Sequence, residues 1–94
     1  MKRTPPPRTK RVRFHLTAKP GSQISLCGSF NHWDVRANMM VDRTGHGDYR
    51  AAVILPRGQH EYKFVVNGQY RPDPDCPRWA INQFGTLNSI LVVA

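Results

Sequence analysis

Cysteine and acidic residues are scarce in this sequence. Its 94 residues include two cysteines, and six Asp and Glu stand against 14 Lys and Arg. Cys27 and Cys76 lie far apart, and no apolar secretion-type segment follows Met1. We therefore expect two free thiols, with Cys27 buried in a strand, and a cytoplasmic location. No apolar run approaches the roughly 18 residues of a membrane helix, so no membrane partner is expected.

The sequence also lacks the groups that catalysis would need. A chain of 94 residues predicts one small domain, whereas barrel-type enzymes need roughly 200 residues or more. Asp73 and Asp75 are closely spaced acids, but Pro72, Pro74 and Pro77 around them indicate a structural turn rather than a glycosidase pair. The four histidines show no metal-ligand spacing. We expect no enzyme activity, no metal and no cofactor.

The net charge of +8 is concentrated at one end of the chain. Six of the 14 basic residues fall between Lys2 and Arg13, which leaves eight basic and six acidic residues, a net +2, in the remainder. Residues 1–10 contain three consecutive prolines and no apolar side chain beyond Met1, which is typical of a flexible arm. We expect a basic arm over 1–10, a folded domain over 11–94, and no specific nucleic-acid partner.

Short alternating runs predict strands throughout the domain. In "VRFHL", Val12, Phe14 and Leu16 alternate with Arg13 and His15, as in a strand with one wet face. The other strand-like runs are "QISLC", "NMMV" with Met40 inward, "YRAAVIL", "HEYKFVV" and "NSILVV". No segment has a helical period. Six or seven short strands with frequent turns predict an all-β antiparallel sandwich, whose core or near-core aromatics are Phe14, Phe30, Tyr49, Tyr62 and Phe64.

Three local patterns refine this arrangement. Asn67-Gly68 between strand-like runs predicts a type I′ hairpin, which places Tyr70 just after a tight turn. If Tyr62 and Phe64 face the core, Lys63 points to the opposite, wet side. The proline-rich "RPDPDCPRW" predicts an irregular connector.

Taken in order, "GSFNHW", "LPRGQHEYKFVVNGQY", "DPDCP" and "FGTLNSILVV" resemble carbohydrate-binding module family 48. This family includes the glycogen-binding domain of the β-subunit of AMP-activated protein kinase and the N-terminal domains of isoamylase-like enzymes. The resemblance covers about Val12 to Val93. It implies an immunoglobulin-like, early-set β-sandwich that binds α-1,4-glucan (glycogen, maltooligosaccharides or cyclodextrin) without cleaving it.

The resemblance also implies a set of sugar-binding residues. The two aromatic platforms fall on Trp33 and Tyr70. At the position of Tyr70, kinase-type members more often have tryptophan. The other implied positions are Lys63, Phe84 (in place of leucine), Gly85, Thr86 and Asn88. Aromatic rings can cover the C–H face of a glucose unit, while amide, ammonium and hydroxyl groups replace the water lost by sugar hydroxyls.

Other interpretations stay open at this point. Trp33 alone would more often be a loop anchor, and Trp79 has no counterpart in the family pattern, so it is either an added platform or a local core residue. A protein-interaction module of the same fold, with vestigial or no sugar binding, is the alternative function. A glucan-metabolising enzyme or a kinase would be the expected protein partner.

Overall fold

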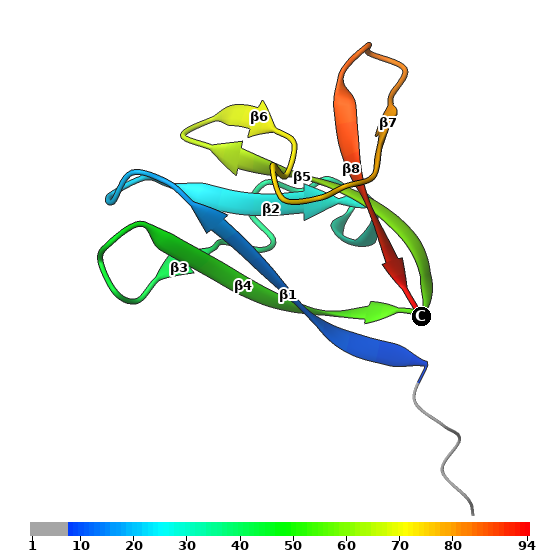
Figure 1. The fold of residues 1–94 in the computed structure, drawn as a ribbon, viewed down its shortest axis with the longest axis horizontal. Coiled ribbons are helices and arrows are strands. Elements are labelled where there is room, and N and C mark those ends of the chain that lie inside the picture. Colours follow the sequence, from blue (N-terminus) through cyan, green and yellow to red (C-terminus); the bar gives the residue numbers. More distant parts are fainter. Residues whose placement is uncertain (1–7) are drawn as a thin grey trace, which may run out of the picture.

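The computed structural model describes residues 8–94, which form two antiparallel sheets and one short 3₁₀ helix (Figure 1). The elements in chain order are β1 (Thr9–Thr17), β2 (Ile24–Gly28), η1 (Ser29–Asn31), β3 (Val41–Asp42), β4 (Asp48–Pro56), β5 (Gly58–Val66), β6 (Gln69–Arg71), β7 (Trp79–Ile81) and β8 (Leu87–Val93). The predicted all-β sandwich is confirmed. Within residues 8–94, no helix has the length and apolar character needed to cross a bilayer.

The first sheet has the strand order β1-β4-β3. Phe14 on β1 lies opposite Ala51 on β4, and His15 lies opposite Arg50. Phe14 and Leu16 are buried while Arg13 and His15 are exposed, which confirms the predicted alternation. One face of this sheet therefore packs on the core and the other is polar.

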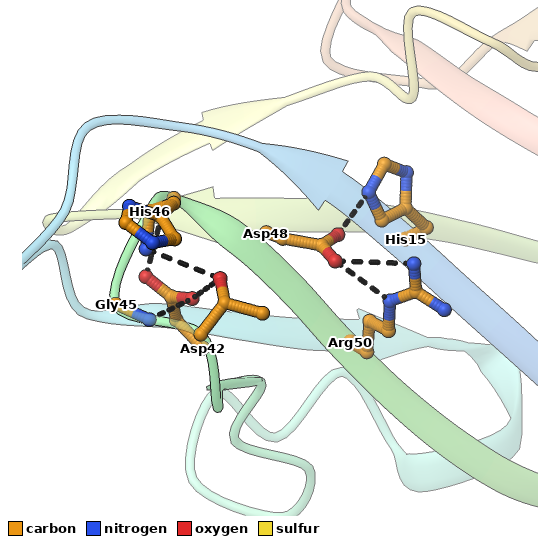
Figure 2. Close-up of polar contacts among 8 residues, drawn as sticks. His15, Asp42, Gly45, His46, Asp48 and Arg50 are labelled. Carbon is orange, nitrogen blue, oxygen red and sulfur yellow. Dashed lines mark hydrogen bonds and ion pairs between the residues drawn. The ribbon is translucent and has the colours of Figure 1, made fainter.

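The polar face of the first sheet carries a small charge network. Figure 2 shows Asp48 between His15 and Arg50. Its Oδ2 accepts a hydrogen bond from Arg50 Nε at 3.1 Å, and its other oxygen pairs with His15. In the neighbouring loop, the Asp42 carboxylate accepts the Gly45 and Gly47 amides at 3.0 and 2.7 Å. The basic groups around Asp48 are thus partly neutralised within the sheet.

The second sheet has the order β2-β5-β8-β7, with β6 also paired to β5. β2 pairs with the second half of β5, from Tyr62 to Val66, while β8 pairs with the first half, from Gly58 to Tyr62. β6 occupies the remaining edge, opposite Phe64–Val66. β5 is therefore the central strand, with β2, β6 and β8 as its pairing partners.

Aromatic and aliphatic side chains from both sheets fill the space between them. The ring of Phe14 lies 5.0 Å from that of Tyr62 in an edge-to-face contact and 6.1 Å from that of Phe30. Phe30 therefore anchors η1 to the core, as predicted. The buried core residues are Phe14, Leu16, Ile24, Leu26, Met40, Tyr49, Leu55, Tyr62, Phe64, Val66 and Val93.

The start of the first strand and the end of the proline-rich segment differ from the expectations. β1 begins at Thr9, before the expected domain boundary at residue 11, because the pairing with β4 extends to Pro56. Residues 1–7 of the expected arm lie outside the described residues. The proline-rich segment ends in a strand that was not predicted, β7, paired with β8. Cys27 is buried as expected, and both cysteines are free thiols.

Candidate functional site

A groove lies over the outer face of the second sheet. Its volume is about 830 Å³, which is within the range of small-molecule sites. The lining residues are Trp33, Glu61, Lys63, Tyr70, Ala80, Ile81, Asn82, Gln83, Phe84, Thr86 and Asn88. Six of the seven predicted site residues are therefore brought to one groove. The seventh, Gly85, lies in the turn that forms one wall.

Trp33 follows η1 in a tight, left-handed segment. His32 and Trp33 both have φ of 57°, and the Trp33 amide donates to the Gly28 carbonyl at 2.9 Å. This closed turn directs the chain out of β2 and holds the indole at the groove. Trp33 is 37% exposed, so it is neither a fully buried loop anchor nor a free side chain.

Tyr70 reaches the groove from the β5–β6 hairpin. Asn67 and Gly68 have φ of 50° and 84°, the two positive values that a type I′ turn requires. The predicted hairpin is thus confirmed, and it places Tyr70 opposite Val65. Tyr70 is 58% exposed, which leaves much of its ring free.

Lys63 lies beneath the groove rather than in open solvent. Tyr62 and Phe64 face the core, so the expected orientation of Lys63 on the opposite face is confirmed. The expectation that this face is wet is wrong at this position, because Lys63 is only 7% exposed. Its Nζ donates to Thr86 Oγ1 at 2.7 Å and lies 5.9 Å from the centre of the Tyr70 ring. The ammonium is therefore fixed by two partners.

A chain of side-chain hydrogen bonds continues from Lys63 across the groove. Asn82 Nδ2 donates to Thr86 Oγ1 at 2.7 Å and to Asn88 Oδ1 at 3.1 Å. Asn88, which is buried, donates from Nδ2 to Glu61 Oε1 at 3.1 Å. These contacts satisfy the buried polar groups and fix their directions.

The turn between β7 and β8 is held by Asn82. Its Oδ1 accepts the amides of Phe84 and Thr86 at 2.9 and 3.2 Å, and its carbonyl accepts the Gly85 amide at 3.0 Å. Gly85 has φ of 78°, a conformation that favours glycine. Phe84 is largely exposed at the tip of this turn, on the rim of the groove. It therefore does not fill the groove.

Hydrogen-bonding capacity is left over on several of these groups. Lys63 has three ammonium protons and uses one, and the amide of Asn88 has a second N–H. Thr86 accepts two hydrogen bonds, which leaves its own hydroxyl proton free to donate. Glu61 offers a second carboxylate oxygen as an acceptor. Together with two aromatic faces, these groups suit a neutral ligand with hydroxyls and an apolar face.

Carboxylates are sparse in this part of the molecule. Among residues 8–94, Glu61 is the one acid that lines the groove. Asp73 instead accepts the Tyr62 hydroxyl at 2.6 Å and the Asp75 amide at 2.9 Å, so these acids form the structural turn that was predicted. Burial, reinforced by this hydrogen bond to Asp73, raises the pKa of the Tyr62 phenol far above its ordinary value of 10.0.

Sequence reasoning missed three polar residues of the groove, namely Glu61, Asn82 and Gln83. Glu61 lies two residues before Lys63 and therefore on the same face of β5, so the strand pattern could have identified it. Asn82 carried no such signal, because its role depends on the turn after β7. Trp79 does not line the groove and is not a core residue, so it is neither an added platform within the groove nor part of the core.

Comparisons with known proteins agree on one family. Residues 11–94 match the family described as the glycogen recognition site of AMP-activated protein kinase. Over 73 residues, 78% of this chain, it is 40% identical to 5'-AMP-activated protein kinase subunit beta-1 of Sus scrofa and of Homo sapiens, and 37% identical to subunit beta-2 of Mus musculus. The matched region spans 56%, 25% and 26% of these relatives, so the chain corresponds to part of them.

Proposed function

We infer the function from the family: the chain belongs to the family of the glycogen recognition site of AMP-activated protein kinase. We propose that it binds α-1,4-glucan, such as glycogen or a maltooligosaccharide, in the groove over β5 and does not cleave it. The observation that carries this proposal is the convergence of Trp33, Tyr70 and the Lys63–Thr86–Asn82–Asn88 network on one groove.

The apolar part of the interaction comes from the aromatic rings. The rings of Trp33 and Tyr70 cover the C–H faces of two glucose units, and each aromatic side chain can bury roughly 150–250 Å². Phe84 extends this surface from the rim, since its side chain is 79% exposed and follows the turn at Asn82. Tyrosine in place of tryptophan gives a smaller face but adds a hydroxyl that can hydrogen-bond to the sugar.

The polar part comes from groups already held in place. Sugar hydroxyls that leave water cost about 1–3 kcal/mol each unless they find partners. Lys63 and Asn88 donate to these hydroxyls with their remaining protons, Thr86 donates from its hydroxyl, and Glu61 accepts with its second oxygen. Because the network exists before binding, little side-chain entropy is lost when the sugar enters.

Two competing functions fit the groove less well. Retaining glycosidases need two carboxylates about 5–5.5 Å apart, and the groove offers Glu61 alone among the described residues. Single-stranded nucleic acid needs a strongly basic groove, whereas here Lys63 is paired with Thr86 and lies near a carboxylate. A protein-interaction module without sugar binding has no specific observation in its favour.

The names of the relatives indicate which partners the whole protein could have. Those relatives are subunits of a kinase, so we propose a kinase as the protein partner and targeting or regulation by glucan as the role. A glucan-metabolising enzyme is the second candidate partner. The proposed location is the cytoplasm.

Calorimetric titration with maltoheptaose and β-cyclodextrin tests the proposed function. We expect binding in the groove with Kd on the order of micromolar to millimolar, roughly −8 to −4 kcal/mol, and little change between low and physiological salt. Cellohexaose, a β-linked glucan, serves as the control ligand and should bind at least about tenfold more weakly. Absence of heat and of NMR shifts with both α-glucans would overturn the proposal.

A further inference from the structure

Trp79 is an exposed tryptophan that the groove does not use. It is 58% exposed, and it belongs neither to the core nor to the groove lining. It pairs with Ser89 on β8, whereas its neighbour Ala80 pairs with Asn88 and lines the groove. Successive residues of a strand point to opposite faces, so the Trp79 side chain points away from that of Ala80.

Apolar surface nevertheless continues from the groove to Trp79. Ile81 lines the groove, is 70% exposed, and shares a strand face with Trp79 two residues away. In Figure 1 the β7–β8 turn projects beyond the rest of the second sheet. We call Trp79 and Ile81 the Trp79 surface.

We propose that the Trp79 surface is a second contact site for α-glucan, separate from the groove. This inference rests on the proposed function, because the second site takes the same α-glucan as the groove. The indole face stacks on the C–H face of a glucose unit, as Trp33 does in the groove, and Ile81 forms an apolar bridge between the two sites. A glucan polymer can then be held at two places by one domain.

The size of the Trp79 surface favours a sugar over a second copy of the chain. A stable protein interface buries about 800 Å² on each partner, whereas one aromatic side chain supplies roughly 150–250 Å². β7 is a strand of three residues, which offers a short edge for pairing with another chain. A single stacked glucose unit needs only one aromatic face, which is what this surface presents.

The two tryptophans of the chain report on the two sites separately. In the ¹⁵N-labelled protein each indole N–H gives its own NMR signal. We expect maltoheptaose to shift the Trp33 signal first and the Trp79 signal at higher concentration. In Trp33→Ala the Trp79 signal should still shift over the same concentration range, because its site does not require the groove.

The outcomes separate this inference from the proposed function. A Trp79 signal that stays fixed at maltoheptaose concentrations well above those that saturate Trp33 would overturn the second site and leave the groove intact. If neither signal moves, the proposed function fails and the second site fails with it. A Trp79 shift that disappears in Trp33→Ala would mean that it only reports on the groove, and would also overturn the second site.

Binding to polymer gives an independent readout. Trp79→Ala should lower the apparent affinity for glycogen by about fivefold or more through loss of the second contact, and leave maltoheptaose binding in the groove unchanged. Ile54→Ala is the matched control, since Ile54 is 69% exposed on the first sheet, and its effect should be within about twofold. Unchanged glycogen binding in Trp79→Ala, or a dimer that this substitution dissociates in sedimentation, would overturn the proposal.

Discussion

The Lys63 ammonium donates a hydrogen bond to the Thr86 hydroxyl at 2.7 Å, and this contact joins the central strand of the second sheet to the β7–β8 turn. Lys63 is buried by the Tyr70 ring and by that turn, which are contributed by different parts of the chain. Its position is thus fixed by tertiary packing. The groove consequently holds its ammonium in place before any sugar arrives.

Replacing this ammonium should separate binding from folding. In Lys63→Met the aliphatic stem is kept and the charge is lost, and Thr86 keeps its hydrogen bond from Asn82. Hydrogen bonds to charged groups contribute about 1.5–3 kcal/mol, so we expect maltoheptaose binding to weaken by about tenfold or more. Because an apolar side chain of similar volume often replaces a buried charge at little cost, urea unfolding should change by at most about 1 kcal/mol. Equal maltoheptaose affinity in wild type and variant would remove Lys63 from the site.

Gly85 should matter for binding through its backbone conformation. An alanine Cβ there would touch nothing within 4 Å, but φ of 78° makes the substitution strained by about 1–2 kcal/mol. Gly45 has the same properties, with φ of 74° and open space, in the loop after β3. We expect Gly85→Ala and Gly45→Ala to lower stability similarly, and only Gly85→Ala to weaken glucan binding. Equal binding by the two variants would show that the turn geometry is not required.

Gly28 is needed for a different reason. Its φ of −170° is ordinary extended backbone, but a Cβ would lie 2.5 Å from the Glu61 carbonyl oxygen and 3.0 Å from Tyr62 Cβ. We expect Gly28→Ala to destabilise the fold by about 1–3 kcal/mol through overpacking between β2 and β5, measured by urea unfolding. A urea unfolding curve identical to that of the wild type would contradict this close approach.

The two thiols should differ in reactivity. Burial raises the pKa of Cys27 from its ordinary 9.0 to about 11, against a smaller opposing effect of Lys63. The neutral form of the Cys27 thiol is thus favoured in the folded state. The stability that Cys27 contributes to the fold is present below about pH 9 and is lost as the pH rises towards 11. At pH 8 a thiol reagent should label Cys76 first and Cys27 only on unfolding, as mass spectrometry of the peptides would show. Labelling of native Cys27 at the rate of Cys76 would contradict its burial.

Local patterns were enough to predict much of the fold. The alternation in β1 and β5 and the Asn67-Gly68 hairpin depend on neighbouring residues alone, and all three are observed. β7 was missed because the prolines before Trp79 mask a strand that forms only by pairing with β8. Asn82 was missed with it, since its hydrogen bonds exist only once the β7–β8 turn is closed.

The burial of Lys63 and the role of Gly28 show the same limit. Strand parity places Lys63 on the outer face, but its cover comes from β6 and the β7–β8 turn. Gly28 permits close packing of β2 on β5, a contact that its local sequence does not reveal. Both features depend on contacts between segments far apart in the sequence, which local patterns do not encode.

Trp33 is the platform on which glucan binding in the groove most depends. Calorimetry of Trp33→Ala with maltoheptaose, paired with a thermal melt, is its most direct test. We predict a loss of about tenfold or more in affinity with a fold that melts cooperatively near the wild-type temperature, because Trp33 lies outside the core. Affinity equal to that of the wild type would contradict the groove assignment, and an unfolded variant would show that Trp33 is a structural anchor instead.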